Sequence, residues 1–125
     1  MGRIRLELDV DGKKCWTLFD SGARNSYITQ EAAAGLSLLP VQGIRKSAWG
    51  GREHQVTHVC HVPTHLEGHA LEIPASVVDE IGPDENGRRI DILFGALAMQ
   101  QWNVKLDVPN ERLDLTHLTH DFVEF

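Results

Sequence analysis

The sequence lacks the features that would cross-link the chain or anchor it in a membrane. It has two cysteines among 125 residues, and no apolar run approaches the roughly 18 residues of a membrane helix. Cys15 and Cys60 fit neither a Cys-x-x-Cys redox pair nor a zinc knuckle, and their spacing leaves a disulfide open. We expect two reduced thiols and a cytoplasmic protein. The first residues, MGRIRLELDV, also lack the apolar core of a signal peptide.

A basic surface is also missing. The 12 lysines and arginines are scattered, 18 aspartates and glutamates outnumber them, and the net charge is -6 at pH 7. Nucleic-acid binding requires clustered basic residues, so we expect neither nucleic acid nor a membrane as a partner. With 42% hydrophobic and 24% charged residues, the composition is that of a soluble globular protein. The length predicts a single domain over residues 1–125.

The first third of the chain predicts a hairpin followed by a helix. Apolar residues alternate in RIRLELDV, which indicates a strand with one buried face. Asp11-Gly12 then predicts a tight turn, and the return strand CWTLF ends at Asp20. The segment SYITQEAAAGLSLLP combines capping residues with helix-forming Glu and Ala, and it predicts a helix of about two turns.

The remainder predicts mostly strands. Residues 41–81 are rich in β-branched side chains and turn glycines, and the polar residues 82–89 predict an exposed loop. The segment IDILFGALAMQQW indicates a buried strand that runs into Gly95 and then a second short helix. The sequence VKLDVPNERLDL predicts a closing hairpin. We therefore expect an all-β fold with one or two short helices.

Asp20, Ser21 and Gly22 are the residues that most strongly suggest chemistry. Asp20 could simply accept hydrogen bonds from nearby N–H groups in a turn that Gly22 makes tight. Ser21 could be a nucleophile, but the nucleophile elbow requires Gly-x-Ser-x-Gly, and position 19 is Phe. A carboxylate at the end of a buried strand could instead serve as a general base.

The third interpretation is supported by the flanking sequence. The stretch LFDSGARNSYITQEAAAGLSLLP resembles the active-site segment of retropepsin-like aspartic proteases, and DILFGALAM resembles their second signature. Between them, SAWGGREHQV is similar to the glycine-tipped flap hairpin, and VKLDVPNERLDL is similar to the closing hairpin. The resemblance implies an acid-protease fold: a closed, barrel-like β lobe with one or two short helices and a flap hairpin.

The resemblance also implies an aspartic endopeptidase that needs no cofactor and no metal. Two carboxylates about 3 Å apart share one proton, so that one activates water while the other protonates the amide carbonyl. No second Asp-Ser-Gly or Asp-Thr-Gly occurs, so the dyad would pair Asp20 with its copy in a homodimer. The substrate would be a peptide or protein.

The other site residues are carried over from the same resemblance. Ser21 would bond across the dimer axis, and Gly22 and Ala23 would line the cleft. Gly95 would let the second helix pack beneath the active-site loop. The flap tip, which would close on substrate, would consist of Trp49, Gly50 and Gly51.

Two positions depart from the viral pattern. Viral members carry an acidic residue after Asp-[Ser/Thr]-Gly-Ala and an arginine after the second glycine, and these two side chains brace the loop. Here the two positions are Arg24 and Ala96. The chain is therefore more similar to cellular, bacterial or retrotransposon members. A catalytically inactive peptide-binding or dimerisation module of a larger protein is the alternative.

A run of five histidines offers a further alternative, a metal site. On a helix, the first four would share one face. However, Pro63 and the neighbouring β-branched residues favour a strand, which would point the histidines to opposite faces. We expect exposed histidines, or histidines at the flap edge, without a native metal. The run consists of His54, His58, His61, His65 and His69.

Overall fold

The computed structural model describes residues 2–49 and 51–120, without the side chains of Ile44 and Trp49. Gly50, at the expected flap tip, lies outside these residues. Strands dominate the described chain, as predicted, with one α-helix and one 3-10 helix. In chain order the elements are β1 (Arg3–Val10), β2 (Lys13–Asp20), β3 (Tyr27–Thr29), β4 (Leu39–Trp49), β5 (Arg52–Leu66), β6 (His69–Val78), β7 (Ile92–Phe94), α1 (Ala96–Trp102), β8 (Lys105–Asp107), η1 (Val108–Asn110) and β9 (Arg112–Asp114).

The β1/β2 hairpin has the predicted turn. Asp11 and Gly12 both have positive φ, 51° and 82°, as a two-residue hairpin turn matched to strand twist requires. The turn fixes the register from the Val10–Lys13 pair at one end to the Arg3–Asp20 pair at the other. Asp20 is therefore the last residue of a strand whose three preceding residues, Thr17, Leu18 and Phe19, are buried.

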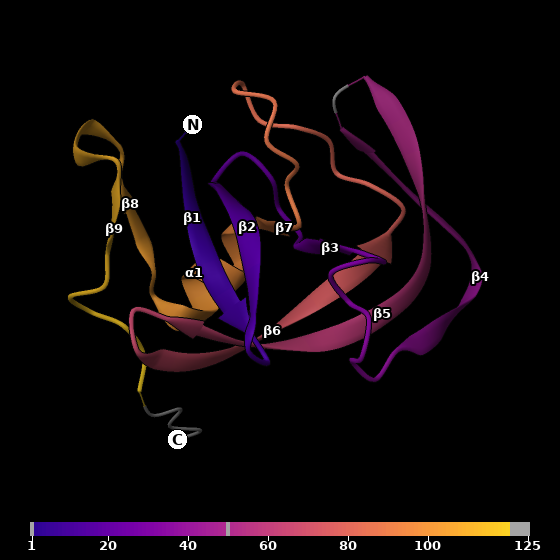
Figure 1. The fold of residues 1–125 in the computed structure, drawn as a ribbon, viewed down its shortest axis with the longest axis horizontal. Coiled ribbons are helices and arrows are strands. Elements are labelled where there is room, and N and C mark those ends of the chain that lie inside the picture. Colours follow the sequence, from indigo (N-terminus) through magenta and orange to yellow (C-terminus); the bar gives the residue numbers. More distant parts are fainter. Residues whose placement is uncertain (1, 50, 121–125) are drawn as a thin grey trace.

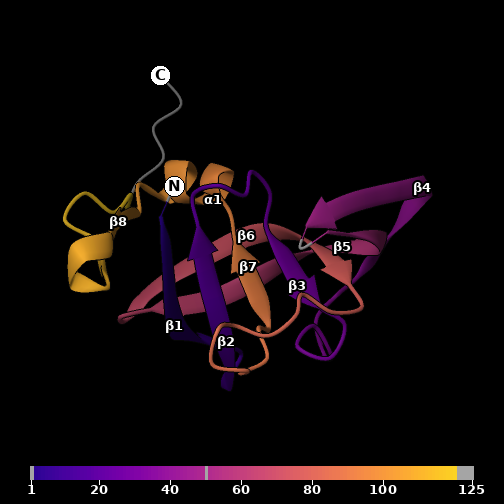
Figure 2. The ribbon, with the colours of Figure 1, turned by 90° about the horizontal axis from the view of Figure 1, so that it is seen from above.

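Seven strands form one sheet in the order β1-β2-β7-β3-β6-β5-β4 (Figures 1 and 2). A further pairing, Asp9 with His65, joins β1 to β5, so six of the strands close into a ring and β4 extends it at β5. The core inside includes Phe19 and Phe94, whose ring centroids lie 4.7 Å apart. The prediction of an all-β lobe is confirmed.

The helix predicted after Asp20 does not form. Tyr27–Thr29 instead enters the sheet between β7 and β6, which leaves only a short segment before Gly35, whose φ is 92°. This segment makes a single turn, in which the Ala33 N–H donates to the Thr29 carbonyl and the Ala32 N–H donates to Thr29 Oγ1. Ala32 and Ala33 are buried in this turn, so strand pairing and burial outweigh local helix propensity.

The second predicted helix does form, as α1. It begins after Gly95, which follows β7, and ends at Trp102. Asn103 caps this end, with a φ of 59° and an N–H that donates to the Gln100 and Met99 carbonyls. Figure 2 shows α1 at the end of the sheet where β2 and β7 finish. Among the described residues, no helix is long and apolar enough to cross a membrane.

Both cysteines are buried and unbonded, as expected for reduced thiols. Cys15 lies in the core, and its burial, with the nearby Asp91 carboxylate, raises the pKa of its thiol to about 11. Burial also raises the pKa of Cys60. Since the thiolate is the reactive form, both groups are expected to be inert in the folded protein.

We expect Cys15 to react with a disulfide reagent at pH 8 roughly 100-fold more slowly in the folded chain than in urea, because a pKa two units higher lowers the thiolate fraction. Rapid labelling of Cys15 in the native protein would contradict this prediction.

The raised pKa of Cys15 also makes the folding stability depend on pH. Because the folded pKa is above the unfolded one, this group's contribution to folding stability persists below about pH 9 and is lost as the pH rises toward 11. In urea unfolding at several pH values, Cys15→Ala should therefore lose less stability with rising pH than the wild type.

Candidate active site

Asp20 ends β2 and begins the loop over residues 20–26. Asp20 is only 6% exposed, and its Oδ1 accepts a 2.8 Å hydrogen bond from the Gly22 N–H. The Ala23 N–H donates to the Asp20 carbonyl at 3.1 Å and closes the predicted tight turn. The carboxylate is thus oriented by the main chain of its own turn.

Arg3 provides the other contact to this carboxylate. Its Nε lies 3.3 Å from Asp20 Oδ2, and the arginine side chain is 55% exposed. Arg3 was not among the residues predicted for the site, although a signal existed. A two-residue turn at Asp11-Gly12 pairs residues whose numbers sum to 23, which places Arg3 opposite Asp20.

Ser21 bonds to the N-terminal segment of its own chain. Its Oγ accepts a 2.8 Å bond from the Gly2 N–H and lies 3.3 Å from the Gly2 carbonyl, to which it can donate. The Ser21 N–H also donates to the Gly2 carbonyl at 3.1 Å. The hydroxyl expected to reach across a dimer axis is therefore occupied within the chain.

Gly95 and the start of α1 support the loop from below. The Ala96 and Leu97 N–H groups donate to the carbonyls of Ala23 and Arg24 at 2.7 and 3.1 Å, and the Gly95 N–H donates to Ser26 Oγ at 3.0 Å. A Cβ at position 95 would lie 2.3 Å from the Asn25 carbonyl oxygen. Only glycine allows this approach.

The β4/β5 hairpin contains the residues expected at the flap tip. Trp49 pairs with Arg52 in the last register position, and Gly51 has a φ of 75°, which glycine adopts without strain. Further along the hairpin, Ser47 Oγ lies 3.0 Å from the Tyr27 hydroxyl, which donates to it. This bond joins the hairpin to the strand that follows the Asp20 loop.

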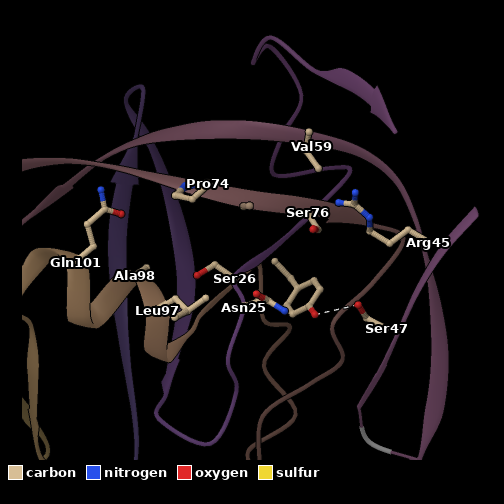
Figure 3. Close-up of a pocket in the computed structure, with 12 residues that line it drawn as sticks. Asn25, Ser26, Arg45, Ser47, Val59, Pro74, Ser76, Leu97, Ala98 and Gln101 are labelled. Carbon is tan, nitrogen blue, oxygen red and sulfur yellow. Dashed lines mark hydrogen bonds between the residues drawn. The ribbon is translucent and has the colours of Figure 1, made fainter. Parts of the chain in front are cut away.

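A pocket of about 480 Å³ lies between the loop, the hairpin and α1 (Figure 3). Its walls come from the end of the Asp20 loop, β3, β4, β5, β6 and α1. This pocket could not be predicted from the sequence, because its residues come from distant segments. The lining residues are Asn25, Ser26, Tyr27, Arg45, Ser47, Val59, Pro74, Ala75, Ser76, Leu97, Ala98 and Gln101.

The histidine run lies on strands, as predicted. Most of these side chains are partly or fully exposed, but His54, which pairs with Ser47 in the β4/β5 hairpin, is buried. His54 Nδ1 lies 3.5 Å from Asp79 Oδ1. The Glu80 backbone N–H, with a smaller contribution from His54, lowers the pKa of Asp79. Within residues 2–49 and 51–120, no three His, Cys, Asp or Glu side chains could hold a metal ion.

A buried carboxylate in an Asp-Ser-Gly loop, supported by a strand, a glycine and a helix, defines an aspartyl-protease-like lobe. The family model for aspartyl proteases matches residues 6–97, and the chain belongs to this family. The sequence matches none of the curated proteins with which it was compared.

Two solved structures show the same fold. The retroviral protease-like domain of Ddi1 from Leishmania major has a TM-score of 0.70 and 15% identity, with 94% of this chain and 91% of that chain covered. The EIAV protease, solved with the inhibitor HBY-793, has a TM-score of 0.60 and 18% identity, with 83% and 91% covered.

We expect Gly95→Ala to lower the free energy of unfolding by about 2–3 kcal/mol, because a methyl group cannot fit against the Asn25 carbonyl without moving the loop or α1. Urea denaturation measures the change. Gly68→Asn is the control, since Gly68 has a φ of 83° with open space around it. Asparagine tolerates positive φ, so this change should cost less than about 1 kcal/mol. Equal effects of the two substitutions would contradict the close approach.

Proposed function

We propose that this chain is an aspartic endopeptidase that acts as a homodimer, with Asp20 of each copy forming the catalytic pair. The observation that carries the proposal is the buried Asp20 carboxylate, oriented by the Gly22 N–H in a loop supported by Gly95 and α1. Membership of the aspartyl protease family supports it. The chain has a single Asp-Ser-Gly, so a second copy is the simplest source of the second carboxylate.

The reaction would use the unequal protonation of two neighbouring carboxylates. The ionised carboxylate accepts a proton from water, whose oxygen adds to the amide carbon, while the protonated carboxylate gives its proton to the carbonyl oxygen. The C–N bond then breaks as the leaving nitrogen takes the proton that the first carboxylate had accepted from water, and the other carboxylate takes a proton back from a hydroxyl of the tetrahedral intermediate. The two Asp20 roles would be interchangeable, because the copies are identical.

The substrate would lie extended between the loop and the β4/β5 hairpin. Main-chain groups of Gly22 and Ala23 would form the floor of the cleft, and Trp49, Gly50 and Gly51 would close over the substrate as a flap. An extended peptide in such a cleft is recognised by main-chain hydrogen bonds, as in strand addition. Ser21 would exchange its Gly2 bonds for bonds to the second copy.

One observation favours a second candidate, an inactive peptide-binding or dimerisation module. Both oxygens of Asp20 are occupied within the chain, Oδ1 by Gly22 and Oδ2 by Arg3. A proton shared with a second Asp20 would compete with the Arg3 contact for Oδ2. A module would retain the fold and bind a peptide without cleaving it.

We expect Asp20→Asn to lower peptide cleavage by at least about 100-fold, because an amide cannot serve as the base or share the proton. The measurement is cleavage of a broad peptide library between pH 3 and 7. Asp11→Asn is the control, since it makes the same chemical change in an exposed turn that accepts asparagine.

A homodimeric enzyme also predicts that activity per mole of chain rises with protein concentration and follows the dimer fraction in sedimentation experiments. Asp20→Asn should leave that fraction unchanged. Peptide binding without cleavage by the wild-type dimer across this pH range would establish the module instead.

A further inference from the structure

We infer that the pocket beside the Asp20 loop is a subsite for an acidic side chain of the substrate, with Arg45 as the group that binds its carboxylate. This inference rests on the proposed peptidase function and adds a substrate class to it. The pocket lining begins at Asn25 and does not include Asp20, Ser21 or Gly22. The acidic side chain therefore belongs to a residue other than the two that form the scissile bond.

Strand pairing places Arg45 on the inner face of the hairpin. Directly paired residues of antiparallel strands share a face, and Arg45 pairs with the buried Val56. Ser47, two residues on, pairs with the buried His54 and bonds to Tyr27. In Figure 3, Arg45 extends from β4 with its guanidinium toward Ser76 on β6.

Arg45 is one of two arginines without a carboxylate partner among the residues that the structure describes. The sequence has eight arginines, and six of them form ion pairs. The other arginine without such a partner is Arg24, which directly precedes the lining residue Asn25. In a chain of net charge -6, both arginines left available for an external anion are thus in or next to the pocket walls. The paired arginines are Arg3, Arg5, Arg52, Arg88, Arg89 and Arg112.

The rest of the lining suits a carboxylate that enters from an extended peptide. Arg45 is the only charged residue among the lining residues, so no acidic group within the lining competes for its guanidinium. Hydroxyl and amide groups of Ser76, Asn25 and Gln101 supply neutral donors, and Leu97 and Pro74 supply apolar contact for the methylenes. The guanidinium fork binds both oxygens of a carboxylate, which favours glutamate or aspartate over their amides.

The test compares pairs of peptides that differ only by Glu or Gln at one position, scanned along a cleaved sequence. We expect one position outside the scissile pair at which glutamate raises kcat/KM about tenfold, equivalent to about 1.4 kcal/mol. Arg45→Met should abolish this preference for Glu over Gln. Arg45→Glu should instead favour a peptide that has lysine at the same position. The ratio should also fall with added salt, because the pocket is open to solvent.

Lys46→Met is the matched control. Lys46 is adjacent on the same strand, on the opposite face, with its Nζ 3.7 Å from Glu53. Lys46→Met removes the same charge as Arg45→Met, but it should leave the Glu/Gln ratio unchanged. A wild-type enzyme without an acidic preference at any position, or a preference that survives Arg45→Met, would overturn the subsite and leave the peptidase proposal intact.

If the wild type cleaves no peptide, the proposed function fails and binding decides the subsite separately. Fluorescence anisotropy of the same labelled peptide pairs with the wild type, Arg45→Met and Lys46→Met then gives the answer. Glutamate-selective binding that depends on Arg45 and not on Lys46 supports the subsite. Equal binding of the Glu and Gln peptides, or no binding of either, overturns it.

Discussion

The arrangement of the candidate site depends on the close approach of Gly95 to the main chain of the Asp20 loop. At this point the end of β7, the start of α1 and the loop meet without an intervening side chain. The first N–H groups of a helix have no acceptors within the helix, and the carbonyls of a loop need donors. Here the N–H groups at the start of α1 donate to the loop carbonyls, so both sets of groups are satisfied. Because Ser26 bonds to the Gly95 N–H, the same contact also fixes a wall of the neighbouring pocket.

This main-chain contact explains how the loop is held without the side-chain pair of viral proteases. Arg24 and Ala96 cannot form an acid–arginine brace, yet their backbone groups take part in the support: the Arg24 carbonyl accepts from Leu97, and the Ala96 N–H donates to Ala23. Since backbone bonds do not depend on side-chain identity, Arg24 is free of a bracing role. The exposed Arg24 contributes positive charge next to the pocket instead.

Patterns over a few neighbouring residues predicted the elements whose structure those same residues determine. Alternation and the Asp11-Gly12 turn were sufficient for β1, β2 and the placement of Asp20 at a strand end. The failed helix shows the limit: Glu31 and the alanines favour a helix, but β3 pairs with strands that lie about fifty or more residues further along. The sequence also could not predict on which face of the β4/β5 hairpin Arg45 lies, because the strand register shifts between Pro40 and Arg45. Alternation grouped His54 and His58 on one face, but His54 is buried and contacts Asp79, a residue distant in the sequence, while His58 is partly exposed.

The Ser21–Gly2 contacts have a thermodynamic consequence for assembly. A second copy that bonds to Ser21 replaces hydrogen bonds that the isolated chain already has, so this exchange contributes little net free energy to association. The driving force for a dimer would have to come from other surfaces, such as exposed apolar side chains like Val108. Release of Gly2 would also free the N-terminal end of β1, so association and the ordering of that end are coupled equilibria.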